Sequence, residues 1–428
     1  MSRYGLLGKK LGHSFSKEIH SAIGGYEYEL IELSEKELDD FLTEKNFSAV
    51  NVTIPYKKTV IPYLDQMTAE AKAIGSVNCI RNDRGRLIGH NTDFDGLAGL
   101  VRHCKAEPAG KKVLILGTGG TAATAAAVCR AMGAAEILKV SRKCRPESGT
   151  CMPDTKKACR GEKIISYEEA QERHSDAKLI INATPCGMYP EIFCSPIDLG
   201  KFSELQAVID VIYNPLRSML VSEAASMGIK SEGGLYMLVE QAVKASEFFF
   251  DTTYEPSLTE KIFRSIYDQK ANIVLTGMPA SGKTTIAGII SEKTGRTVYD
   301  TDDMIEKDQG MKISDIFIRH GEKYFRDVES KVIRQVASKS SAVIATGGGA
   351  VMRPENIQAL KMNGIIFFRD RDPEKLTPTA DRPKAFNMEE IRKRYDERYD
   401  TYVSTADHII KEQDCAEKAA DEILEGLA

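Results

Sequence analysis

The chain has 428 residues, of which 42% are hydrophobic and 28% are charged, and its formal net charge is −4. At roughly 100–200 residues per domain, this length predicts two or three globular domains. No apolar run approaches the roughly 18–20 residues that a membrane-spanning helix needs, which excludes an integral membrane protein. The acidic balance argues against a nucleic-acid partner, since a protein that binds through bulk basic charge has to neutralise phosphates.

The nine cysteines are scattered and form no C-x-x-C pair. This is typical of reduced thiols in a cytoplasmic protein rather than of a disulfide framework. Cys144, Cys151 and Cys159 are spaced too widely for a metal site, and we interpret them as free thiols in a variable loop. The N-terminus lacks the apolar segment of a signal peptide, so we expect a cytoplasmic location.

Residues 1–103 alternate short apolar runs with helix-like stretches, which predicts an α/β region. Ser14 and Ser16 are suited to hold a carboxylate by hydrogen bonds, although such serines more often cap helices or turns. Lys57 is suited to protonate a carbonyl oxygen and Asp93 to orient it, although most lysines are surface charges. From the residues alone, both interpretations stay open.

A first glycine-rich loop follows a short apolar run and precedes a helix-forming stretch that ends at Gly133. Its pattern, Gly117-Thr-Gly119-Gly120-Thr-Ala122, is typical of a dinucleotide-binding turn, where glycines let the backbone approach a pyrophosphate at a helix N-terminus. An ordinary tight turn between a strand and a helix is the alternative. Later strands of this region are expected at residues 134–141, 178–184 and 207–213.

The second predicted strand of this region ends at Ser141, and Arg142 and Lys143 follow it. An NAD site places an acidic residue at this position to hold the ribose 2′-hydroxyl, whereas two cations match a 2′-phosphate. The pair therefore favours NADP over NAD, with a solvated basic loop as the alternative.

Eight motifs occur in order over the first 268 residues: HSFSKEIHS, NVTIPYK, AIGSVNC, GHNTDFDG, LGTGGTA, INATPCGM, DVIYNP and EGGLYMLVEQA. Together they resemble shikimate dehydrogenase. The resemblance implies a two-lobed fold with the active site in the cleft: a shikimate-binding catalytic lobe (residues 1–103 and 235–268) and a Rossmann-like NADP domain (residues 104–234). Lys17 and Ser21 replace the proline and asparagine that are usual in the family, without touching the proposed chemistry.

The resemblance also assigns roles to single residues. It implies Lys57 and Asp93 as the catalytic pair, and Ser14 and Ser16 as the ligands of the substrate carboxylate. The other substrate-binding residues that it implies are Thr53, Asn78, Tyr213 and Gln241. For NADP it implies Gly117, Gly119, Gly120, Thr121, Ala122, Arg142, Lys143, Val211 and Gly234, with Tyr213, Val211 and Gly234 near the nicotinamide end.

The second glycine-rich loop, Gly277-Met-Pro-Ala-Ser-Gly282-Lys283-Thr284, is a complete G-x-x-x-x-G-K-[ST] P-loop. In such a loop, backbone N–H groups cradle phosphates, the lysine reaches the β- and γ-phosphates and the hydroxyl holds Mg²⁺. ATP and Mg²⁺ are therefore expected cofactors of a third α/β region. Its elements are expected as strands at 272–277, 297–302, 341–347 and 364–369 and an amphipathic helix at 321–337.

Polar residues after this P-loop indicate a second ligand. Asp300 and Asp302 alternate at a strand end, so both can point into one site, one serving Mg²⁺ and the other a hydroxyl nucleophile. Arg326 flanks the apolar stripe of the predicted helix and can reach the cleft, with a solvated ion pair to Glu329 as the alternative. Glycines at 347–349 end a strand where a ligand approaches the backbone.

These features resemble shikimate kinase over residues 271–428, through GMPASGKTT, DTDDMIE, GEKYFR-x-x-E, TGGGAV, an Arg-Pro pair and a late Arg-x-x-x-Tyr. The resemblance implies a P-loop kinase domain with a parallel sheet, in which Lys283 and Asp302 act in catalysis. For ATP it implies Ala280, Ser281, Gly282, Lys283, Thr284, Thr285 and the lid residue Arg382; for the acceptor Asp302, Arg326, Gly348 and Arg398; and for Mg²⁺ Thr284 and Asp300. The lid is atypical, because Lys384 and Ala385 replace the usual leucines.

We therefore interpret the chain as an α/β bifunctional enzyme that reduces 3-dehydroshikimate with NADPH and phosphorylates the resulting shikimate with ATP and Mg²⁺. One alternative is a preference for quinate or NAD in the first half. Another is a catalytically silent, metabolite-sensing regulator, which should have lost Lys57, Asp93, Lys283 or Asp302. The expected partners are small molecules, without nucleic acid or membrane, and a homodimer is left open.

Overall fold

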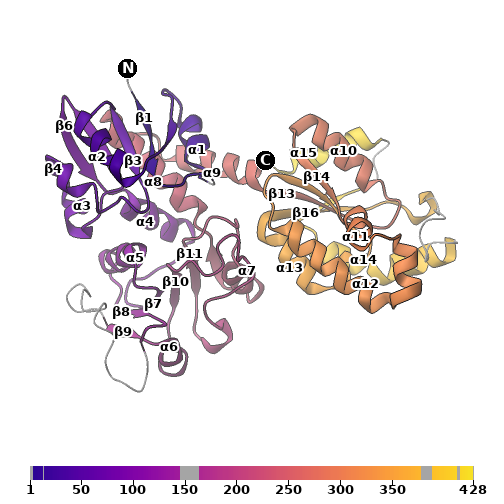
Figure 1. Cartoon of the computed structure of the whole chain (residues 1–428). Helices are drawn as coiled ribbons and strands as arrows, with labels where there is room; N and C mark the ends of the chain where they lie inside the picture. Colours follow the sequence, from indigo (N-terminus) through magenta and orange to yellow (C-terminus); the bar gives the residue numbers. More distant parts are fainter. Residues whose placement is uncertain (1–2, 13, 145–162, 377–387, 412–414, 428) are drawn as a thin grey trace. The chain divides into compact units, whose positions relative to one another are not determined.

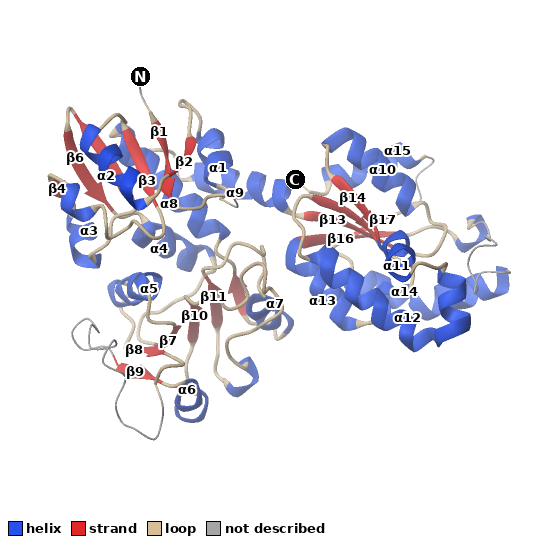
Figure 2. Ribbon diagram, in the orientation of Figure 1, coloured by secondary structure: helices blue, strands red, loops and turns tan. Residues whose placement is uncertain are grey.

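The computed structural model describes residues 3–12, 14–144, 163–376, 388–411 and 415–427 (Figure 1). Two compact units make up the chain, Met1–Asn214 with Ser218–Ile266 and Pro215–Arg217 with Tyr267–Ala428. Both units contain sheets with parallel strands and packed helices, which confirms the predicted α/β class (Figure 2). None of the described helices combines the length and the apolar character that crossing a membrane requires.

The first lobe of the first unit is built on a sheet whose described strands follow the order β2-β1-β3-β5-β6-β4. β1 is parallel to β2 and β3, whereas β5 is antiparallel to β3 and β6. The strands are β1 (Tyr4–Gly8), β2 (Glu29–Glu32), β3 (Ala49–Val52), β4 (Gln66–Met67), β5 (Cys79–Asp83) and β6 (Arg86–His90). Helices α1 (Ser16–Ile23), α2 (Glu35–Glu44), α3 (Ala69–Ile74), α4 (Asp93–His103) and α8 (Leu235–Phe250) complete the lobe.

Local sequence explains where several of these helices begin and how they pack. At the start of α2, the Ser34 hydroxyl accepts a hydrogen bond from the Glu37 N–H, and the Glu37 carboxylate accepts one from the Ser34 N–H at 2.8 Å, which forms a capping box. α8 comes late in the chain but packs against α4 and α1. Gly96 permits this approach, because a Cβ there would lie 2.8 Å from the Met237 carbonyl oxygen of α8.

The second lobe of the first unit is a parallel sheet with the order β12-β11-β10-β7-β8-β9 in the described residues. The chain starts at β7, runs outward through β8 and β9, and returns to β10 on the other side of β7. This reversal is the position where doubly wound sheets bind ligands. The strands are β7 (Lys112–Leu116), β8 (Glu136–Val140), β9 (Lys163–Ile165), β10 (Leu179–Asn182), β11 (Ala207–Asp210) and β12 (Lys230–Glu232), with helices α5 (Gly120–Ala131), α6 (Tyr167–Arg173) and α7 (Met219–Ser226).

The second unit holds a parallel sheet with the order β14-β15-β13-β16-β17 over the part described. Figure 2 shows α10 and α15 on one side of it and α12, α13 and α14 on the other. The strands are β13 (Asn272–Thr276), β14 (Thr297–Asp300), β15 (Ala342–Ala345), β16 (Gly364–Arg369) and β17 (His408–Ile410). The helices are α10 (Lys283–Thr294), α11 (Thr301–Gln309), α12 (Ile313–Ala337), α13 (Pro354–Asn363), α14 (Met388–Thr405) and α15 (Ala416–Glu425). Helix α9 (Ser257–Lys270) precedes them, and its residues up to Ile266 belong to the first unit.

Each strand expected after residue 104 is present within a few residues of its predicted position. The weakly patterned edge strands β9, β12 and β17 were not predicted, because each has only three residues. The helix expected at 321–337 is the second part of α12, and the helical segment before it was missed. Gly321, with φ 81° and ψ 173°, is non-helical and marks the kink between the two parts.

Gly234 shows how space, rather than backbone conformation, can require glycine. It stands directly before α8, and its φ of −74° is open to any residue. A Cβ there would overlap the carbonyl group of Val211, and its N–H donates to the Ile212 carbonyl oxygen at 2.8 Å. Because the obstacle is backbone, no side-chain rotation can relieve it.

We predict that Gly234→Ala lowers the free energy of unfolding of the first unit by at least about 2 kcal/mol, because the extra carbon overpacks a rigid contact. Urea denaturation followed by circular dichroism would measure the change. Gly12→Ala is the control, since a Cβ at Gly12 meets no atom within 4 Å. Equal stability of Gly234→Ala and the unaltered chain would show that the contact can relax.

Candidate active sites

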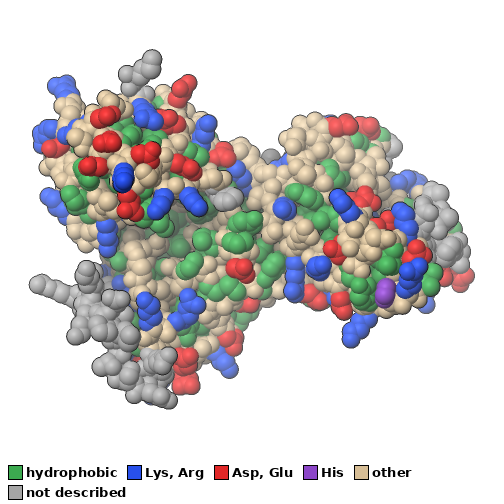
Figure 3. All heavy atoms as spheres, in the orientation of Figure 1, with side chains coloured by type: hydrophobic (Ala, Val, Ile, Leu, Met, Phe, Trp, Pro, Cys, Tyr) green, Lys and Arg blue, Asp and Glu red, His purple; other side chains and the backbone are tan. Residues whose placement is uncertain are grey.

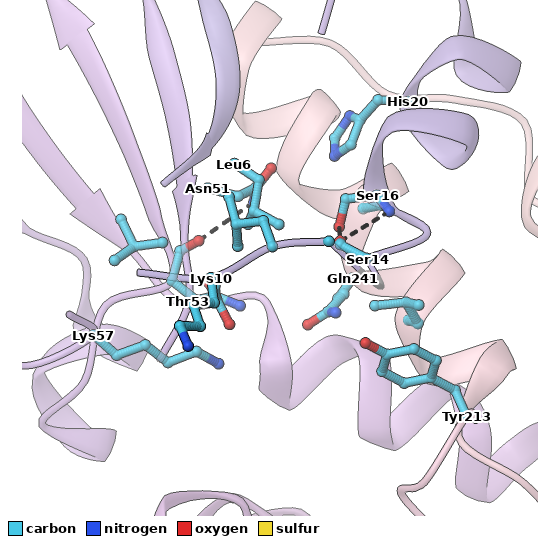
Figure 4. Close-up of a pocket in the computed structure, with 16 residues that line it drawn as sticks. Leu6, Lys10, Ser14, Ser16, His20, Asn51, Thr53, Lys57, Tyr213 and Gln241 are labelled. Carbon is cyan, nitrogen blue, oxygen red and sulfur yellow. Dashed lines mark hydrogen bonds between the residues drawn. The ribbon is translucent and has the colours of Figure 1, made fainter. Parts of the chain in front are cut away.

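The first candidate site is a cavity of about 320 Å³ in the first unit, at the carboxyl ends of β1 and β3 (Figure 4). Seven of the residues predicted to bind or convert substrate line it: Ser14, Ser16, Thr53, Lys57, Asn78, Tyr213 and Gln241. They come from the loop after β1, the start of α1, the segment after β3, the residue before β5, the loop after β11 and helix α8. The cavity thus gathers polar side chains that lie more than 200 residues apart in the sequence.

Lys57 and Asp93 form a direct ion pair, with 2.7 Å between Lys57 Nζ and Asp93 Oδ2. The second carboxylate oxygen, Asp93 Oδ1, accepts a hydrogen bond from Asn78 Nδ2 at 2.8 Å, and the Asp93 N–H donates to Asn91 Oδ1 at 2.9 Å. The Asn78 amide is held in turn, because its Oδ1 accepts the Thr92 N–H at 2.8 Å. The lysine ammonium is therefore positioned at the cavity by a carboxylate that is itself fixed.

Ser14 and Ser16 present their hydroxyls together. Ser14 Oγ donates to Ser16 Oγ at 3.0 Å, and the Ser16 N–H donates to Ser14 Oγ at 3.2 Å. α1 begins at Ser16, so the first turn of a helix supports the pair. Two adjacent hydroxyls of this kind can donate to both oxygens of one carboxylate.

The cavity is also lined by three polar side chains that the sequence did not single out as site residues: Lys10, His20 and Asn51. His20 stacks on Tyr28 with 3.8 Å between ring centroids, and burial lowers the pKa of its imidazole to about 3, so the ring is neutral. Asn51 Oδ1 accepts from the Tyr28 hydroxyl at 2.8 Å. The alternation of Asn51 with Thr53 at the end of β3 was a usable signal, since residues two apart in a strand share a face.

The first glycine-rich loop lies at the point where the second sheet reverses. Gly117, at φ 111°, follows β7, and a Cβ there would lie 3.1 Å from the Ala183 carbonyl oxygen after β10. Gly119 precedes α5, whose first turn contains Gly120, Thr121 and the fully buried Ala122. Backbone crowding and a free helix N-terminus are the features that a pyrophosphate site uses.

A buried polar cluster braces the strand ends beside this loop. Asp210 Oδ2 accepts from the Ser218 hydroxyl at 2.6 Å, and Asp210 Oδ1 accepts from Asn182 Nδ2 and from the Ile212 N–H, each at 3.0 Å. Although these donors favour the carboxylate, burial outweighs them and raises the pKa of Asp210 to about 6. The cluster ties β10, β11 and the start of α7 together.

The two cations predicted for the NADP 2′-phosphate are placed differently. Arg142 lines a cavity of about 500 Å³ beyond the end of β8, together with Thr184, Cys186 and Ser195. Both side chains are exposed, but Lys143 is not among the residues that line this cavity, and its N–H donates to Ser141 Oγ at 3.2 Å. Arg142 is therefore the better placed of the two for an anionic group.

Val211, Tyr213 and Gly234, predicted for the nicotinamide end, lie close together. Gly234 packs on the Val211 carbonyl, and Tyr213 lines the substrate cavity beside Gln241. Tyr213 also packs edge-on against Phe15, with 5.3 Å between the ring centroids. Burial raises the pKa of its hydroxyl, which keeps the group protonated.

The second candidate site is formed by the P-loop between β13 and α10. Lys283 is 7% exposed and its ammonium donates to the carbonyl oxygens of Gly277 at 3.0 Å and Met278 at 2.8 Å. Ser281 is buried, and Ala280 adopts a φ of 62°. Thr284 and Thr285 stand in the first turn of α10, so backbone N–H groups of the loop and the helix start point to one side.

The residues predicted for Mg²⁺ fit that ion. The Thr284 hydroxyl donates to Asp300 Oδ2 at 2.8 Å, so a hydroxyl and a carboxylate oxygen converge at the edge of the P-loop. Asp300 Oδ1 caps α11 by accepting the N–H groups of Asp302 at 3.0 Å and Asp303 at 3.4 Å. Oxygen ligands of this kind suit a hard divalent cation that also binds phosphates.

The acceptor residues predicted for this unit lie around the glycines that follow β15. Arg326 Nη1 and Glu329 Oε2 are 2.7 Å apart, and a Cβ at Gly347 would lie 2.5 Å from Asp302 Oδ1 and 3.1 Å from Glu329 Oε1. Arg398 Nη1 donates to the Gly348 carbonyl oxygen at 2.9 Å. The structure therefore brings Asp302, Arg326, Gly348 and Arg398 into one region, whereas Arg382, predicted for ATP, lies outside the described residues.

The alternative for Arg326 was a solvated ion pair with Glu329; the ion pair is present, but it is not solvated, because the Glu329 side chain is 1% exposed. In the described part of the chain, its Oε1 has no hydrogen-bond partner. Burial raises the pKa of Glu329, against the opposing effect of Arg326.

On the face drawn in Figure 3, basic and acidic side chains are interspersed over both units.

Family models match two parts of the chain. The model for the shikimate dehydrogenase substrate-binding domain matches residues 6–80, and the model for shikimate kinase matches residues 279–428. The shikimate dehydrogenase (NADP(+)) of Clostridium perfringens is 34% identical over 281 residues, which cover 62% of this chain and 98% of the relative.

Solved structures agree with these matches. A chorismate mutase/shikimate 5-dehydrogenase fusion protein from Clostridium acetobutylicum superposes with a TM-score of 0.56 and 33% identity, covering 62% of this chain and 97% of that one. The shikimate 5-dehydrogenase of Thermus thermophilus, in complex with NADP(H) and shikimate, gives a TM-score of 0.54 and 29% identity, covering 62% and 99%.

Asp210 leads to a prediction about pH. Its pKa is raised from 3.8 to about 6 in the folded chain, so this carboxyl reduces folding stability progressively as the pH rises from about 4 to about 6. We predict that Asp210→Asn, which cannot ionise, gains stability relative to the unaltered chain over that interval, by on the order of 2–3 kcal/mol. Urea denaturation of both proteins between pH 4.5 and 7.5 measures the difference. A difference that stays constant with pH would contradict the prediction.

Proposed function

Since the chain belongs to the shikimate dehydrogenase family in its N-terminal part and carries a shikimate kinase domain in its C-terminal part, we propose that it catalyses two consecutive reactions. The first unit reduces 3-dehydroshikimate to shikimate with NADPH. The second unit transfers the γ-phosphoryl group of ATP to shikimate and forms shikimate 3-phosphate. The observation that carries this proposal is that one chain holds both a fixed Lys57–Asp93 pair at a ring-sized polar cavity and a complete P-loop beside Asp302.

In the proposed reduction, NADPH supplies hydride to the carbonyl carbon of the ring. The Lys57 ammonium donates a proton to the carbonyl oxygen as negative charge develops there. Asp93 holds the ammonium at 2.7 Å, and Asn78 keeps the other carboxylate oxygen occupied. The Lys57 ammonium is therefore oriented before the substrate binds, which lowers the entropy cost of reaching the reactive arrangement.

Residues that line two cavities of the first unit support the proposed substrate and cofactor. Ser14 and Ser16 present two hydroxyls to a carboxylate, while Thr53 and Gln241 line the remaining wall for ring hydroxyls. Arg142, which lines the cavity beyond the end of β8, matches the 2′-phosphate that distinguishes NADP from NAD. The Thermus thermophilus relative, whose structure holds NADP(H) and shikimate, supports the same pair of ligands.

In the proposed phosphorylation, ATP supplies the γ-phosphoryl group. Asp302 orients or deprotonates the attacking hydroxyl, and Lys283 stabilises the negative charge on the phosphates. Thr284 and Asp300 would hold Mg²⁺, which neutralises phosphate charge. Arg326 and Arg398 would bind the acceptor carboxylate by charge-assisted hydrogen bonds.

The direct test supplies the purified chain with 3-dehydroshikimate, NADPH and Mg-ATP and identifies the products by mass. We predict shikimate 3-phosphate in the unaltered protein. Lys57→Ala should lower the rate of reduction at least about a hundredfold, because the proton donor is lost, while kinase turnover stays near normal. Lys58→Ala, which changes the adjacent exposed lysine, is the matched control.

Lys283→Ala should give the reverse pattern, with shikimate accumulating and no phosphorylated product. If each substitution abolished both activities, the two sites would not be independent. Turnover of quinate with NAD⁺ in preference to shikimate with NADP⁺ would favour the alternative specificity, and the absence of turnover with any of these substrates would favour the regulator.

The cofactor assignment has its own prediction. Arg142→Ala should raise the KM for NADP⁺ about tenfold or more while changing the KM for NAD⁺ less than twofold, because only NADP⁺ carries the 2′-phosphate. Lys143→Ala should have a smaller effect, since Lys143 is not among the residues that line the cavity. Initial rates of shikimate oxidation measure both constants. Equal changes for the two cofactors would contradict the role of Arg142.

A further inference from the structure

Lys10 is a charged residue at the substrate cavity that has no part in the proposed proton transfer. It follows β1 by two residues and lines the cavity together with Leu11, Gly12 and Ser14 from the same loop. Figure 4 draws it among the residues around the cavity, which include Thr53 and Lys57. Its position in the sequence gives no hint of a role, since a lysine in a loop is ordinarily a surface charge.

The loop that carries Lys10 is held in place by its neighbours. The Leu11 side chain is buried, and the Leu11 N–H donates to Glu32 Oε1 at 2.6 Å. The Ser14 N–H donates to the Leu11 carbonyl oxygen at 3.0 Å. A Cβ at Gly8 would lie 2.6 Å from Leu11 Cδ2, so the loop packs tightly on the end of β1. The backbone of Lys10 is therefore anchored between β1 and the serine pair.

The charges around the cavity do not balance without a ligand. Lys10, Lys57 and His20 are the residues of its lining that can carry positive charge. Asp93 neutralises Lys57 at 2.7 Å, and the lowered pKa of His20, about 3, leaves that ring uncharged. In the described residues, Lys10 has no carboxylate within ion-pair distance, whereas its neighbour Lys9 lies 3.9 Å from Glu35. Lys10, whose side chain is exposed, thus brings to the cavity a positive charge that no carboxylate of the described residues neutralises.

The proposed ligand carries the opposite charge. A ring acid enters as a monoanion, and the Ser14 and Ser16 hydroxyls can donate hydrogen bonds to it but bring no charge. An anion in a partly enclosed site loses hydration, and a nearby cation offsets part of that loss. We propose that the Lys10 ammonium is the counter-charge of the substrate carboxylate and makes the site select anionic over uncharged ring substrates. This inference rests on the proposed reduction of a ring acid by the first unit.

The test compares Lys10→Met and Lys10→Arg with the control Lys9→Met, using the full chain, NADP⁺ and two probes, shikimate and its uncharged methyl ester. Lys10→Met should raise the KM for shikimate about threefold to tenfold and change kcat much less. The KM for the methyl ester should stay within twofold of its original value. Lys10→Arg should restore the KM for shikimate, and Lys9→Met should leave it unchanged.

Ionic strength gives a second readout that a merely structural role would not move. The KM for shikimate should rise between 50 and 500 mM salt (about 14 to 4 Å in Debye length) in the unaltered chain, and rise less in Lys10→Met. An unchanged KM in Lys10→Met, or equal losses for shikimate and its ester, would overturn the inference. Failure of the unaltered chain to oxidise shikimate would instead overturn the proposed function of the first unit.

Discussion

Both sites depend on one constraint, which is that parallel strands of a sheet end along the same edge. Residues that follow different strands therefore meet at this edge, however far apart they stand in the sequence. Lys10 follows β1 and Thr53 follows β3; Gly117 follows β7 and Ala183 follows β10; Gly277 follows β13 and Gly347 lies just beyond β15. Backbone crowds at such an edge, which is why a Cβ at Gly277 would lie only 2.7 Å from the Arg369 carbonyl oxygen.

Charged groups are buried or partly buried at these edges, and the two sites differ in how completely such groups are paired. In the first unit, Asp93 has a partner for each carboxylate oxygen, Lys57 for one and Asn78 for the other. In the second unit, Glu329 pairs with Arg326 through Oε2 only, and its pKa is raised by burial. A buried ion pair is favourable only when its remaining hydrogen-bonding groups are satisfied. Both carboxylate oxygens of Asp93 are thus satisfied before a ligand binds, whereas the second site keeps a buried acceptor atom of Glu329 beside Asp302.

The parts of the structure that were predicted correctly are those encoded over short distances. Strand, glycine turn and helix follow one another directly at Gly117 and Gly277, so their order in the sequence is their order in space. The predicted positions of Ser14, Lys57 and Asn78 around one cavity came from ordered motifs rather than from spacing, and the structure places these residues together. The order of the motifs therefore carried information that the spacing of single residues did not.

The parts that sequence reasoning missed depend on tertiary burial. His20 belongs to a helix whose pattern does not reveal that Tyr28 and Asn51 enclose its ring. Glu329 looks like a surface partner of Arg326 at helical spacing, but the fold buries it beside Gly347, which lies just beyond β15. Lys143 and Arg142 are adjacent in sequence, yet only Arg142 lines the cavity after β8. In each case, neighbours distant in sequence decide the environment of the side chain.

The two proposed sites would hold the same kind of ring acid in physically different ways. In the second unit, two guanidinium groups would fix the carboxylate bidentately, which suits an in-line transfer that tolerates little rotation of the acceptor. In the first unit, neutral hydroxyls would set the direction of the carboxylate and one long, exposed lysine side chain would supply the charge. The two sets of residues have no member in common and belong to separate compact units. On this proposal, the substrate preference of each half would be set by its own loops, and a change in one loop would leave the preference of the other half intact.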